Sequence, residues 1–472
     1  MPLLQKNIAL YTDFYQLTMA QGYFLERRQE TGASFDYFYR ENPFQGGYLI
    51  FAGLGDLLPI LQEMKFGAED LDYLESLGFR KEFLDYLRTF KFQGTVYSVQ
   101  EGEVIFPFEP VVRVDGNIIE TQVIETILLN LLNFESLIAT KASRVRAAAG
   151  DRRVIDFGLR RAQGLGGVHA SKAAIIGGID ATSNVYSSFE FGLQPSGTQA
   201  HSWIQSYDDE LTSFRRFAEY YPDRCILLVD TYDTLRSGIP NAVTVAKELE
   251  ARGFRMVAVR LDSGDLAYLS KKARQMLDDA GLQYIKIVVS NQLDEYLIRS
   301  LLQQGAPIDF FGVGTRLITA NGSPALEGVY KLAMFDGKPR LKFSENYSKA
   351  TLPGLKRVLR YSNDDGMFYA DAVVLESEPP VDCIYHPFFP EQHSSLKQCT
   401  SEPLLRKWME KGRIIKRPGL PQEASAYAKE RLAKCSEEHK RFEYPHTYKV
   451  GISSALMNLR TKTTEELQQL IS

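Results

Sequence analysis

The chain has 472 residues, of which 44% are hydrophobic and 24% are charged, a composition typical of a folded globular protein with a large core. The formal net charge is −4, so no excess of basic residues favours nucleic acid or an acidic membrane surface as a partner. At about 150 residues a domain, the length favours two or three domains.

The sequence gives no sign of export or membrane insertion. Residues 1–24 lack a basic start followed by an apolar block and a small-residue cleavage site. No apolar run approaches the roughly 18 residues that a membrane span requires. The four cysteines are sparse and widely spaced, which does not favour a disulfide framework. We therefore expect a cytoplasmic protein.

Residues 1–145 predict an α+β domain. Apolar and polar residues alternate over 34–40, "SFDYFYR", which is typical of a strand, and 46–64 predicts a helix after a Gly-rich start. Residues 92–116 predict a β-meander. Residues 123–150 predict a long helix that leads into the next domain.

Residues 150–335 repeat one rhythm, in which a short apolar run, a polar turn and an amphipathic helix follow one another. The helices are expected over 240–253, 265–281 and 291–305, each closing on glycine. This spacing predicts βα units in a parallel sheet. The apolar runs are "RVIDFG" (153–158), "CILLVDT" (225–231), "FRMVAVRLDSGD" (254–265), "YIKIVVSN" (284–291), "IDFFGVGT" (308–315) and "GVYKLAM" (328–334).

Residues 336–472 return to strands, such as "GMFYADAVVLESEP", and end in a helix. Within this segment four possible zinc ligands fall in one window, although neither CxxC nor HxxxH occurs there. The alternative is a plain loop rich in aromatic residues and proline. The four residues are Cys383, His386, His393 and Cys399.

Polar side chains follow four of the predicted strands directly. Because the carboxyl ends of parallel strands meet at one face, where the active sites of (β/α) barrels assemble, these side chains predict a shared site. The alternative is that each of them only caps the following helix. The four residues are Asp156, Asp230, Asp262 and Ser290.

Three further patterns suggest an anionic substrate. In "DFFGVGTRL", glycines and Thr315 follow a late strand, where backbone N–H groups can approach a phosphate, although a tight turn also explains them. Arg260 and Asp262 lie on the same face of their strand, as substrate ligands or as a simple ion pair. Phe157, at a strand end, and Arg160 offer an aromatic face beside a guanidinium fork; a core phenylalanine is the alternative.

His201 lies in "QPSGTQAHSWIQSY", a stretch in which packing does not call for a histidine. From Trp203 to Tyr221, apolar residues recur at spacings of three and four, which predicts one amphipathic helix beginning near His201. A helix N-terminus favours anions and disfavours the protonated ring, so the imidazole would be a neutral nucleophile. A capping or hydrogen-bonded histidine is the alternative.

Taken together, seven ordered motifs resemble those of the nicotinate phosphoribosyltransferases, and the resemblance runs from about residue 8 to about residue 455. The motifs are "YTDFYQLTMAQGYF", "FYRENPFQGGYLIFAGL", "DFGLRRAQG", "ATSNV", "GTQAHSWIQSY", "VRLDSGD" and "FGVGT".

This resemblance implies ATP-coupled synthesis of nicotinate mononucleotide and pyrophosphate from nicotinate and 5-phosphoribosyl 1-pyrophosphate, the first step of NAD salvage from nicotinate. It implies an irregular TIM-like (β/α) barrel at 150–335, an N-terminal α+β domain at 1–145, and a C-terminal segment, 336–472, that packs on the N-terminal domain. It also implies a homodimer with shared active sites. The charge and the absence of an apolar span favour neither nucleic acid nor a membrane as a partner.

The resemblance also assigns residues. His201 would be the residue that ATP phosphorylates, and Asp262 a second catalytic residue. The substrate-binding positions would be Tyr15, Arg40, Phe157, Arg160, Ser183, Thr198, Arg260, Ser290, Asn291, Gly314 and Thr315.

Around the pyridine ring, Tyr15 of the partner subunit would stack with Phe157, and Arg160 would lie near the substrate carboxylate. The related nicotinamide enzymes carry an aspartate where this chain has Ser183. Since an aspartate repels a carboxylate and a serine does not, Ser183 favours nicotinate over nicotinamide. A helix N-cap is the alternative role for Ser183.

Around the phosphates, Arg40 of the partner subunit would add positive charge, and Gly314 and Thr315 would hold the 5′-phosphate. Arg260 and Asp262 would hold the substrate and its ribose. Ser290 and Asn291 would lie close to them. Mg²⁺ would arrive with pyrophosphate or ATP rather than occupy a fixed protein site, because it keeps most of its waters. The rival interpretations are a nicotinamide or quinolinate enzyme, a silent relative, and another phosphosugar enzyme.

Overall fold

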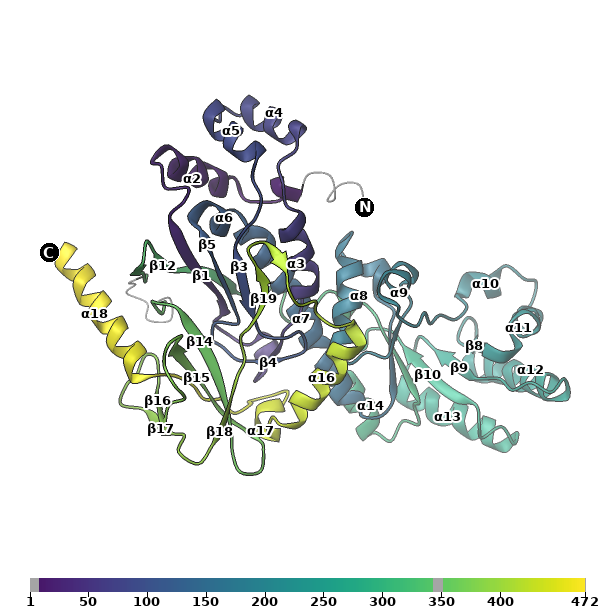
Figure 1. Ribbon diagram of the computed structural model, residues 1–472. Coiled ribbons are helices and arrows are strands. Elements are labelled where there is room, and N and C mark those ends of the chain that lie inside the picture. Colours follow the sequence, from purple (N-terminus) through teal and green to yellow (C-terminus); the bar gives the residue numbers. More distant parts are fainter. Residues whose placement is uncertain (1–7, 343–350, 472) are drawn as a thin grey trace. The chain divides into compact units, whose positions relative to one another are not determined.

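The computed structural model describes residues 8–342 and 351–471, and the chain divides into two compact units (Figure 1). Unit 1 takes the residues up to Leu137 and from Ala325 onward, and unit 2 takes Ile138–Pro324. The sequence places the corresponding boundaries at 145–150 and 335. Residues 1–7 belong to the stretch 1–24, in which the sequence predicts no export signal. They lie outside the described residues.

The first sheet of unit 1 joins strands from both ends of the chain. Strand β1 runs antiparallel to β5 on one side and to β12 on the other. In sheet order, the seven strands are β13 (Lys338–Pro339), β12 (Gly328–Phe335), β1 (Gly32–Tyr39), β5 (Val112–Asn117), β3 (Thr95–Ser98), β19 (Arg406–Glu410) and β20 (Arg413–Ile414).

Two strand predictions change in this sheet. The run 328–334 was expected to continue the parallel βα rhythm, but it forms β12, which pairs antiparallel with β1 in unit 1. The alternation over 34–40 predicts a strand with one exposed face, yet β1 is buried on both faces from Ala33 to Tyr39. Asp36 is accommodated there because the Nζ atom of Lys356 lies 2.8 Å from its carboxylate.

A second sheet of unit 1 is built from the C-terminal segment, and a two-stranded pair joins β2 (Leu49–Ile50) to β4 (Val104–Ile105). The second sheet is mixed, because β15 and β21 run parallel while its other pairs are antiparallel. In order, its strands are β17 (His393–Ser395), β16 (Cys383–Tyr385), β21 (Val450–Ile452), β15 (Phe368–Leu375), β14 (Lys356–Ser362) and β18 (Thr400–Pro403).

The long helix predicted over 123–150 is confirmed as α7 (Glu125–Ala149), and the expected helix after the Gly-rich start is α3 (Leu54–Glu63). Among the described residues, none of the helices is both long and apolar enough to span a bilayer. The other helices of unit 1 are α2 (Phe14–Leu25), α4 (Ala68–Ser76), α5 (Lys81–Arg88), α6 (Ile118–Val123), α16 (Pro421–Ala433), α17 (Glu437–Lys440) and α18 (Ser454–Ile471).

Unit 2 contains one sheet whose strands are all parallel, as the βα rhythm predicts. Its six strands, in order, are β7 (Ala181–Thr182), β6 (Arg153–Asp156), β11 (Phe310–Val313), β10 (Lys286–Ser290), β9 (Ala258–Leu261) and β8 (Ile226–Leu228). Within 138–324, all of it described, β7 and β8 are edge strands that do not pair with each other. The sheet is therefore open, and the TIM-like barrel that the resemblance implies is not closed.

The three helices predicted from periodicity and glycine stops are confirmed as α12 (Ile239–Ala251), α13 (Leu266–Asp279) and α14 (Glu295–Gln303). One helix prediction is wrong. The stretch from His201 to Tyr221 forms two helices, α10 (His201–Gln205) and α11 (Glu210–Tyr220), because the Asp209 side chain accepts from the Thr212 N–H and starts a new helix. The remaining α-helices of unit 2 are α8 (Gly166–Ile176), α9 (Val185–Phe191) and α15 (Thr315–Ile318).

Candidate functional site

The side chains that follow the strands of unit 2 form one hydrogen-bonded group. The Asp262 Oδ1 atom accepts from the Arg260 guanidinium at 2.8 Å and also from the Ser290 hydroxyl. None of the four residues at the strand ends is a helix N-cap. Asp265 and Asp294 cap α13 and α14 instead. The shared-site prediction is thus favoured over the capping alternative for Asp230, Asp262 and Ser290, but it is wrong for Asp156, which bonds other partners.

Arg260 is held by three side chains at once. Its Nε donates to the Ser290 hydroxyl at 2.9 Å, its Nη1 to the Thr198 hydroxyl at 2.9 Å, and its Nη2 to Asp262. The Ser290 hydroxyl in turn donates a hydrogen bond to Asp262, which closes a small ring of hydrogen bonds. The guanidinium side chain is only 12% exposed, so its orientation is fixed before any substrate arrives.

Phe157 lies against this guanidinium, with the Arg260 Cζ atom 5.1 Å from the ring centroid. Glycine at 312 makes this position possible, because a Cβ there would lie 2.4 Å from the Phe157 ring. The sequence suggests that Phe157 and Arg160 act together, but Arg260 is the arginine that stacks on the ring. Gly312 is therefore needed for the packing of the aromatic ring.

His201 is the first residue of α10, and its ring is held between two side chains of neighbouring strand ends. Its Nδ1 shares a hydrogen bond of 3.0 Å with the Thr231 hydroxyl, and its Nε2 lies 3.8 Å from the Asp262 Oδ2 atom. The side chain is 41% exposed, so the ring is oriented and also accessible. Thr231 was not predicted; its position directly after the strand run "CILLVD" was the available signal.

Asp230 has an unused acceptor in the same group. Its Oδ2 atom accepts from the Asp262 N–H at 2.9 Å and from the Ser263 hydroxyl at 2.6 Å. Its Oδ1 atom is buried and has no hydrogen-bond partner among the described residues. A buried carboxylate oxygen without a donor suits a divalent cation, which prefers oxygen ligands. The residues present therefore fit Mg²⁺.

Asp156 stands apart from this group and has a structural role. Its carboxylate accepts from the Gly158 N–H at 2.7 Å, the Ser171 hydroxyl at 2.8 Å and the Thr182 hydroxyl at 2.7 Å. Burial raises the pKa of Asp156, and these three donors oppose the increase. The carboxylate thereby fixes the turn that carries Phe157.

Ser183 follows this turn and does not cap a helix. Asn184 is the N-cap of α9, since its side chain accepts from the Ser187 N–H at 3.1 Å. The Ser183 N–H donates to the Asp156 carbonyl, and its hydroxyl has no partner among the described residues. The N-cap alternative for Ser183 is wrong, and its hydroxyl is available to a ligand.

Two loops complete the carboxyl edge of the sheet. Gly314 precedes the short helix α15, which begins at Thr315. Asn291 and Gln292 follow β10 at φ values of 94° and 49°, a conformation that non-glycine residues rarely adopt without a local reason.

Among the predicted substrate-binding residues of unit 2, Arg160 does not join this group. Arg160 is exposed on a single turn of helix and has no partner among the described residues. Tyr15, on α2, and Arg40, after β1, belong to unit 1. Tyr15 is 50% exposed. Partial burial raises the pKa of its hydroxyl, and the negative charges of Glu125 and Asp13 raise it further.

The zinc window of the C-terminal segment does not converge. Among the described residues, none of these four side chains belongs to a group whose ligand atoms lie close enough together for a metal ion. The His386 Nδ1 atom accepts from the Phe388 and Phe389 N–H groups at 3.1 and 3.2 Å, so the histidine stabilises a turn.

Three family models match the chain. The nicotinate phosphoribosyltransferase N-terminal domain matches residues 10–133, the nicotinate phosphoribosyltransferase family 152–367, and the nicotinate phosphoribosyltransferase C-terminal domain 355–460. A nicotinate phosphoribosyltransferase of Bacillus subtilis is 41% identical over 98% of this chain and 97% of its own length. This chain belongs to the nicotinate phosphoribosyltransferase family.

Solved structures agree with this assignment. The crystal structure of human nicotinic acid phosphoribosyltransferase is similar with a TM-score of 0.86 and 31% identity, covering 96% of this chain and 99% of that one. A nicotinate-nucleotide pyrophosphorylase from Pyrococcus furiosus is similar with a TM-score of 0.72 and 25% identity, covering 90% and 95%. The resemblance drawn from the seven motifs is therefore confirmed at the level of the family.

Proposed function

We propose that this chain makes nicotinate mononucleotide and pyrophosphate from nicotinate and 5-phosphoribosyl 1-pyrophosphate, and that ATP drives the reaction through phosphorylation of His201. Membership of the nicotinate phosphoribosyltransferase family supports the reaction. The observation that carries the mechanism is the accessible imidazole of His201, which lies beside Asp262. Asp262 is in turn hydrogen-bonded to Arg260.

The phosphoryl step follows from how the ring is held. When the Nδ1–H donates to the Thr231 hydroxyl, Nε2 keeps its lone pair and is the nucleophile. Nε2 attacks the γ-phosphorus of ATP, the bond from that phosphorus to the β,γ-bridging oxygen breaks, and ADP leaves with the electron pair. Hydrolysis by water then returns the imidazole and releases phosphate. Asp262, 3.8 Å from Nε2, orients the ring and favours its cationic phosphorylated form.

The glycosyl step depends on positioning and electrostatics. The bond from the ribose C1 to pyrophosphate breaks, positive charge builds on the sugar, and the pyridine nitrogen forms the new bond to C1. Phe157 offers a flat face to the pyridine ring beside the Arg260 cation, and Asp262 stabilises the charge on the sugar. Gly314 and Thr315 hold the 5′-phosphate, with Ser290 and Asn291 near the ribose.

Mg²⁺, when it arrives with pyrophosphate or ATP, would neutralise the charge of the leaving phosphates. Asp230, through its buried Oδ1 atom, and Asp262 are the carboxylates that would hold it. The chain's own contribution is to keep both carboxylates oriented through the Ser263 and Ser290 hydroxyls.

The remaining assignments extend the same proposal to a homodimer in the cytoplasm. Tyr15 and Arg40 reach the active site of the partner subunit, where Tyr15 stacks on the pyridine and Arg40 faces the phosphates. Arg160 lies near the substrate carboxylate. Ser183 offers its unpartnered hydroxyl to that carboxylate, which gives the preference for nicotinate over nicotinamide.

The test is mononucleotide formation measured by chromatography, with nicotinate, nicotinamide or quinolinate, with phosphoribosyl pyrophosphate and Mg²⁺, and with or without ATP. We expect product from nicotinate alone and a higher yield with ATP. Product from nicotinamide would overturn the role of Ser183, and product from quinolinate alone would overturn the substrate. No product from any of them would leave a silent relative or another phosphosugar enzyme.

A further inference from the structure

His201 is positioned by two parts of unit 2 that are separate in the sequence. One is its own helix, α10, which leads through a short linker into α11. The other is the segment after β8, where the Thr231 hydroxyl lies 3.0 Å from the Nδ1 atom of the ring. Helices α10, α11 and α12 gather beside β8, at one edge of the sheet of unit 2 (Figure 1). The hydrogen bond between His201 and Thr231 therefore depends on how these two parts are held together.

Glu210 joins the two parts. It is the first residue of α11, and it is buried. Its Oε2 atom accepts from the Ser237 hydroxyl and from the side-chain amide of Asn241, the latter at 2.9 Å. Ser237 belongs to a short π-helix, Thr234–Gly238, and Asn241 lies on α12. Both donors thus come from the segment that begins with Thr231.

Each of the two parts is held firmly in itself. On one side, the Trp203 Nε1 atom of α10 donates to the Ser213 carbonyl of α11 at 3.1 Å, so the two helices are tied together. On the other side, the π-helix packs against the end of β8, because a Cβ on Gly238 would lie 1.8 Å from the Val229 carbonyl oxygen. A displacement at Glu210 would therefore shift α10 relative to the strand end.

Stability alone does not explain a carboxylate at this position. The Oε1 atom of Glu210 is buried and has no hydrogen-bond partner among the described residues, and both donors to Oε2 are neutral. Burial of a carboxylate with so few donors costs free energy. The π-helix that supplies one donor is a rare element, found most often at functional sites. These features indicate that Glu210 serves the geometry of the site.

We propose that Glu210 is a positioning residue for His201. It holds α11, and with it α10, at the spacing from Thr231 that keeps the imidazole in one orientation and one tautomer. The consequence for ATP rests on the proposed function, whereas the positioning itself does not. The glycosyl step depends on Arg260, whose hydrogen bonds do not involve Glu210. Loss of Glu210 should therefore affect the ATP-dependent part of the reaction selectively.

The first measurement compares mononucleotide synthesis with and without ATP in the full-length protein. Glu210→Ala should lower the stimulation by ATP about tenfold and leave synthesis without ATP within about twofold. Because both rates are proportional to the amount of folded protein, their ratio does not respond to a simple loss of stability. Glu210→Gln keeps an oxygen acceptor and should restore most of the stimulation. Ser237→Ala, a milder variant, should lower it about two- to fivefold.

The matched control is Glu248→Ala. Glu248 also joins α12 to α11, since the Arg215 Nη2 atom lies 2.7 Å from its carboxylate, but both side chains are more than 40% exposed. Surface pairs of this kind contribute little, so Glu248→Ala should leave both rates unchanged. The proposal is overturned if Glu210→Ala keeps its stimulation by ATP, or if Glu248→Ala loses as much of it.

The second measurement does not depend on enzymatic activity. The chain has only six histidines, and His201→Ala identifies the signal of His201 in a nitrogen NMR spectrum of the imidazole rings. We expect one tautomer in the unmodified protein and a mixture in Glu210→Ala. An unchanged His201 signal in Glu210→Ala overturns the positioning. If the unmodified protein shows no stimulation by ATP, the proposed function of His201 fails, and the NMR signal alone decides the role of Glu210.

Discussion

The His201 Nε2 atom lies 3.8 Å from the Asp262 Oδ2 atom, while the other oxygen of that carboxylate is held by Arg260. One carboxylate therefore contacts both the imidazole ring of His201 and the guanidinium of Arg260. Under the proposed mechanism, the ATP-dependent and ATP-independent parts of the reaction would depend on different atoms of this group, and substitutions should separate them.

His201→Ala should abolish stimulation by ATP, because no ring nitrogen remains to accept the phosphoryl group. Synthesis without ATP should stay within about tenfold of the unmodified protein, since the Arg260 hydrogen bonds remain. Product formation with and without ATP measures both effects. Thr231→Val is a milder variant that removes only the hydrogen bond to the His201 ring. It should weaken ATP stimulation by only about two- to tenfold. Equal loss of both activities in His201→Ala would contradict the separation.

Arg260→Lys should lower kcat/KM by about 100-fold or more, because a point charge cannot replace the three side-chain contacts of the guanidinium. Steady-state kinetics with phosphoribosyl pyrophosphate as the varied substrate gives the value. Arg216→Lys is the control, since Arg216 pairs on the surface of α11 with Glu219. A kcat/KM within twofold for both variants would show that the orientation of Arg260 has no role in turnover.

Gly312→Ala should displace Phe157, because the new Cβ would lie 2.4 Å from its ring. We expect the free energy of unfolding to fall by about 1–3 kcal/mol, the usual cost of overpacking, together with a loss of activity. Gly197→Ala in the same unit is the control, since a Cβ there meets nothing within 4 Å. Thermal unfolding compares the two, and equal Tm values would show that the Phe157 ring has room to move.

Asp156→Asn should change how stability depends on pH. Burial raises the pKa of Asp156 above its ordinary value of 3.8, so the folded protein keeps this proton to a higher pH than the unfolded chain does. This contribution to stability is complete below 3.8, falls as pH rises through the raised pKa, and is constant above it.

Asparagine has no such proton, so Asp156→Asn should gain stability relative to the unmodified protein over that window, by at most about 1.4 kcal/mol per pH unit. Urea unfolding at a series of pH values from acid to neutral gives the difference. Two parallel curves would mean that Asp156 titrates alike in the folded and unfolded states.

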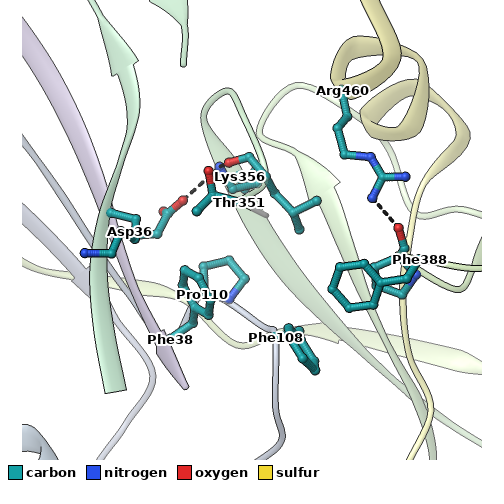
Figure 2. Close-up of a pocket in the computed structure, with 11 residues that line it drawn as sticks. Asp36, Phe38, Phe108, Pro110, Thr351, Lys356, Phe388 and Arg460 are labelled. Carbon is teal, nitrogen blue, oxygen red and sulfur yellow. Dashed lines mark hydrogen bonds and ion pairs between the residues drawn. The ribbon is translucent and has the colours of Figure 1, made fainter. Parts of the chain in front are cut away.

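Lys356→Met should lower the free energy of unfolding by about 3–5 kcal/mol, because it leaves the buried Asp36 carboxylate without its cation (Figure 2). The double variant Asp36→Asn, Lys356→Met should recover most of the loss, since no buried charge remains. Lys407→Met on β19, where the lysine pairs at the surface with Glu410, should change stability by no more than about 1 kcal/mol. Chemical denaturation measures all three, and a double variant no more stable than the single would contradict this account.

Much of unit 2 could be predicted from the sequence, because the relevant signals are local. The order of strands and helices follows from hydrophobic periodicity and from glycine stops, and this predicted α12, α13 and α14. The positions of Asp262 and Ser290 at strand ends predicted that they would share a site, since parallel strands end at the same edge. The identity of the family followed from the order of the motifs.

Other features depend on partners far away in the chain. The sequence at 328–334 fits a parallel strand as well as an antiparallel one, and pairing with β1 decided the matter. The sequence predicts that Phe157 acts with Arg160, which is three residues away. In the structure its ring instead contacts Arg260, about a hundred residues further along the chain. Thr231 and the unused oxygen of Asp230 joined the site only because β8 and β9 are neighbours.

The sequence by itself therefore determined the local elements, the glycines that permit close approach and the residue types of the site. Periodicity, capping and backbone freedom are properties of neighbouring residues, and they can be read without knowing the fold. Only the tertiary structure decided that the sheet of unit 2 stays open and that β12 pairs in unit 1 instead of in that sheet. It also decided which hydrogen-bond donor contacts which carboxylate, such as Arg260 on Asp262. Those outcomes depend on hydrogen bonds and packing between segments that are distant in the chain, and periodicity carries no information about them.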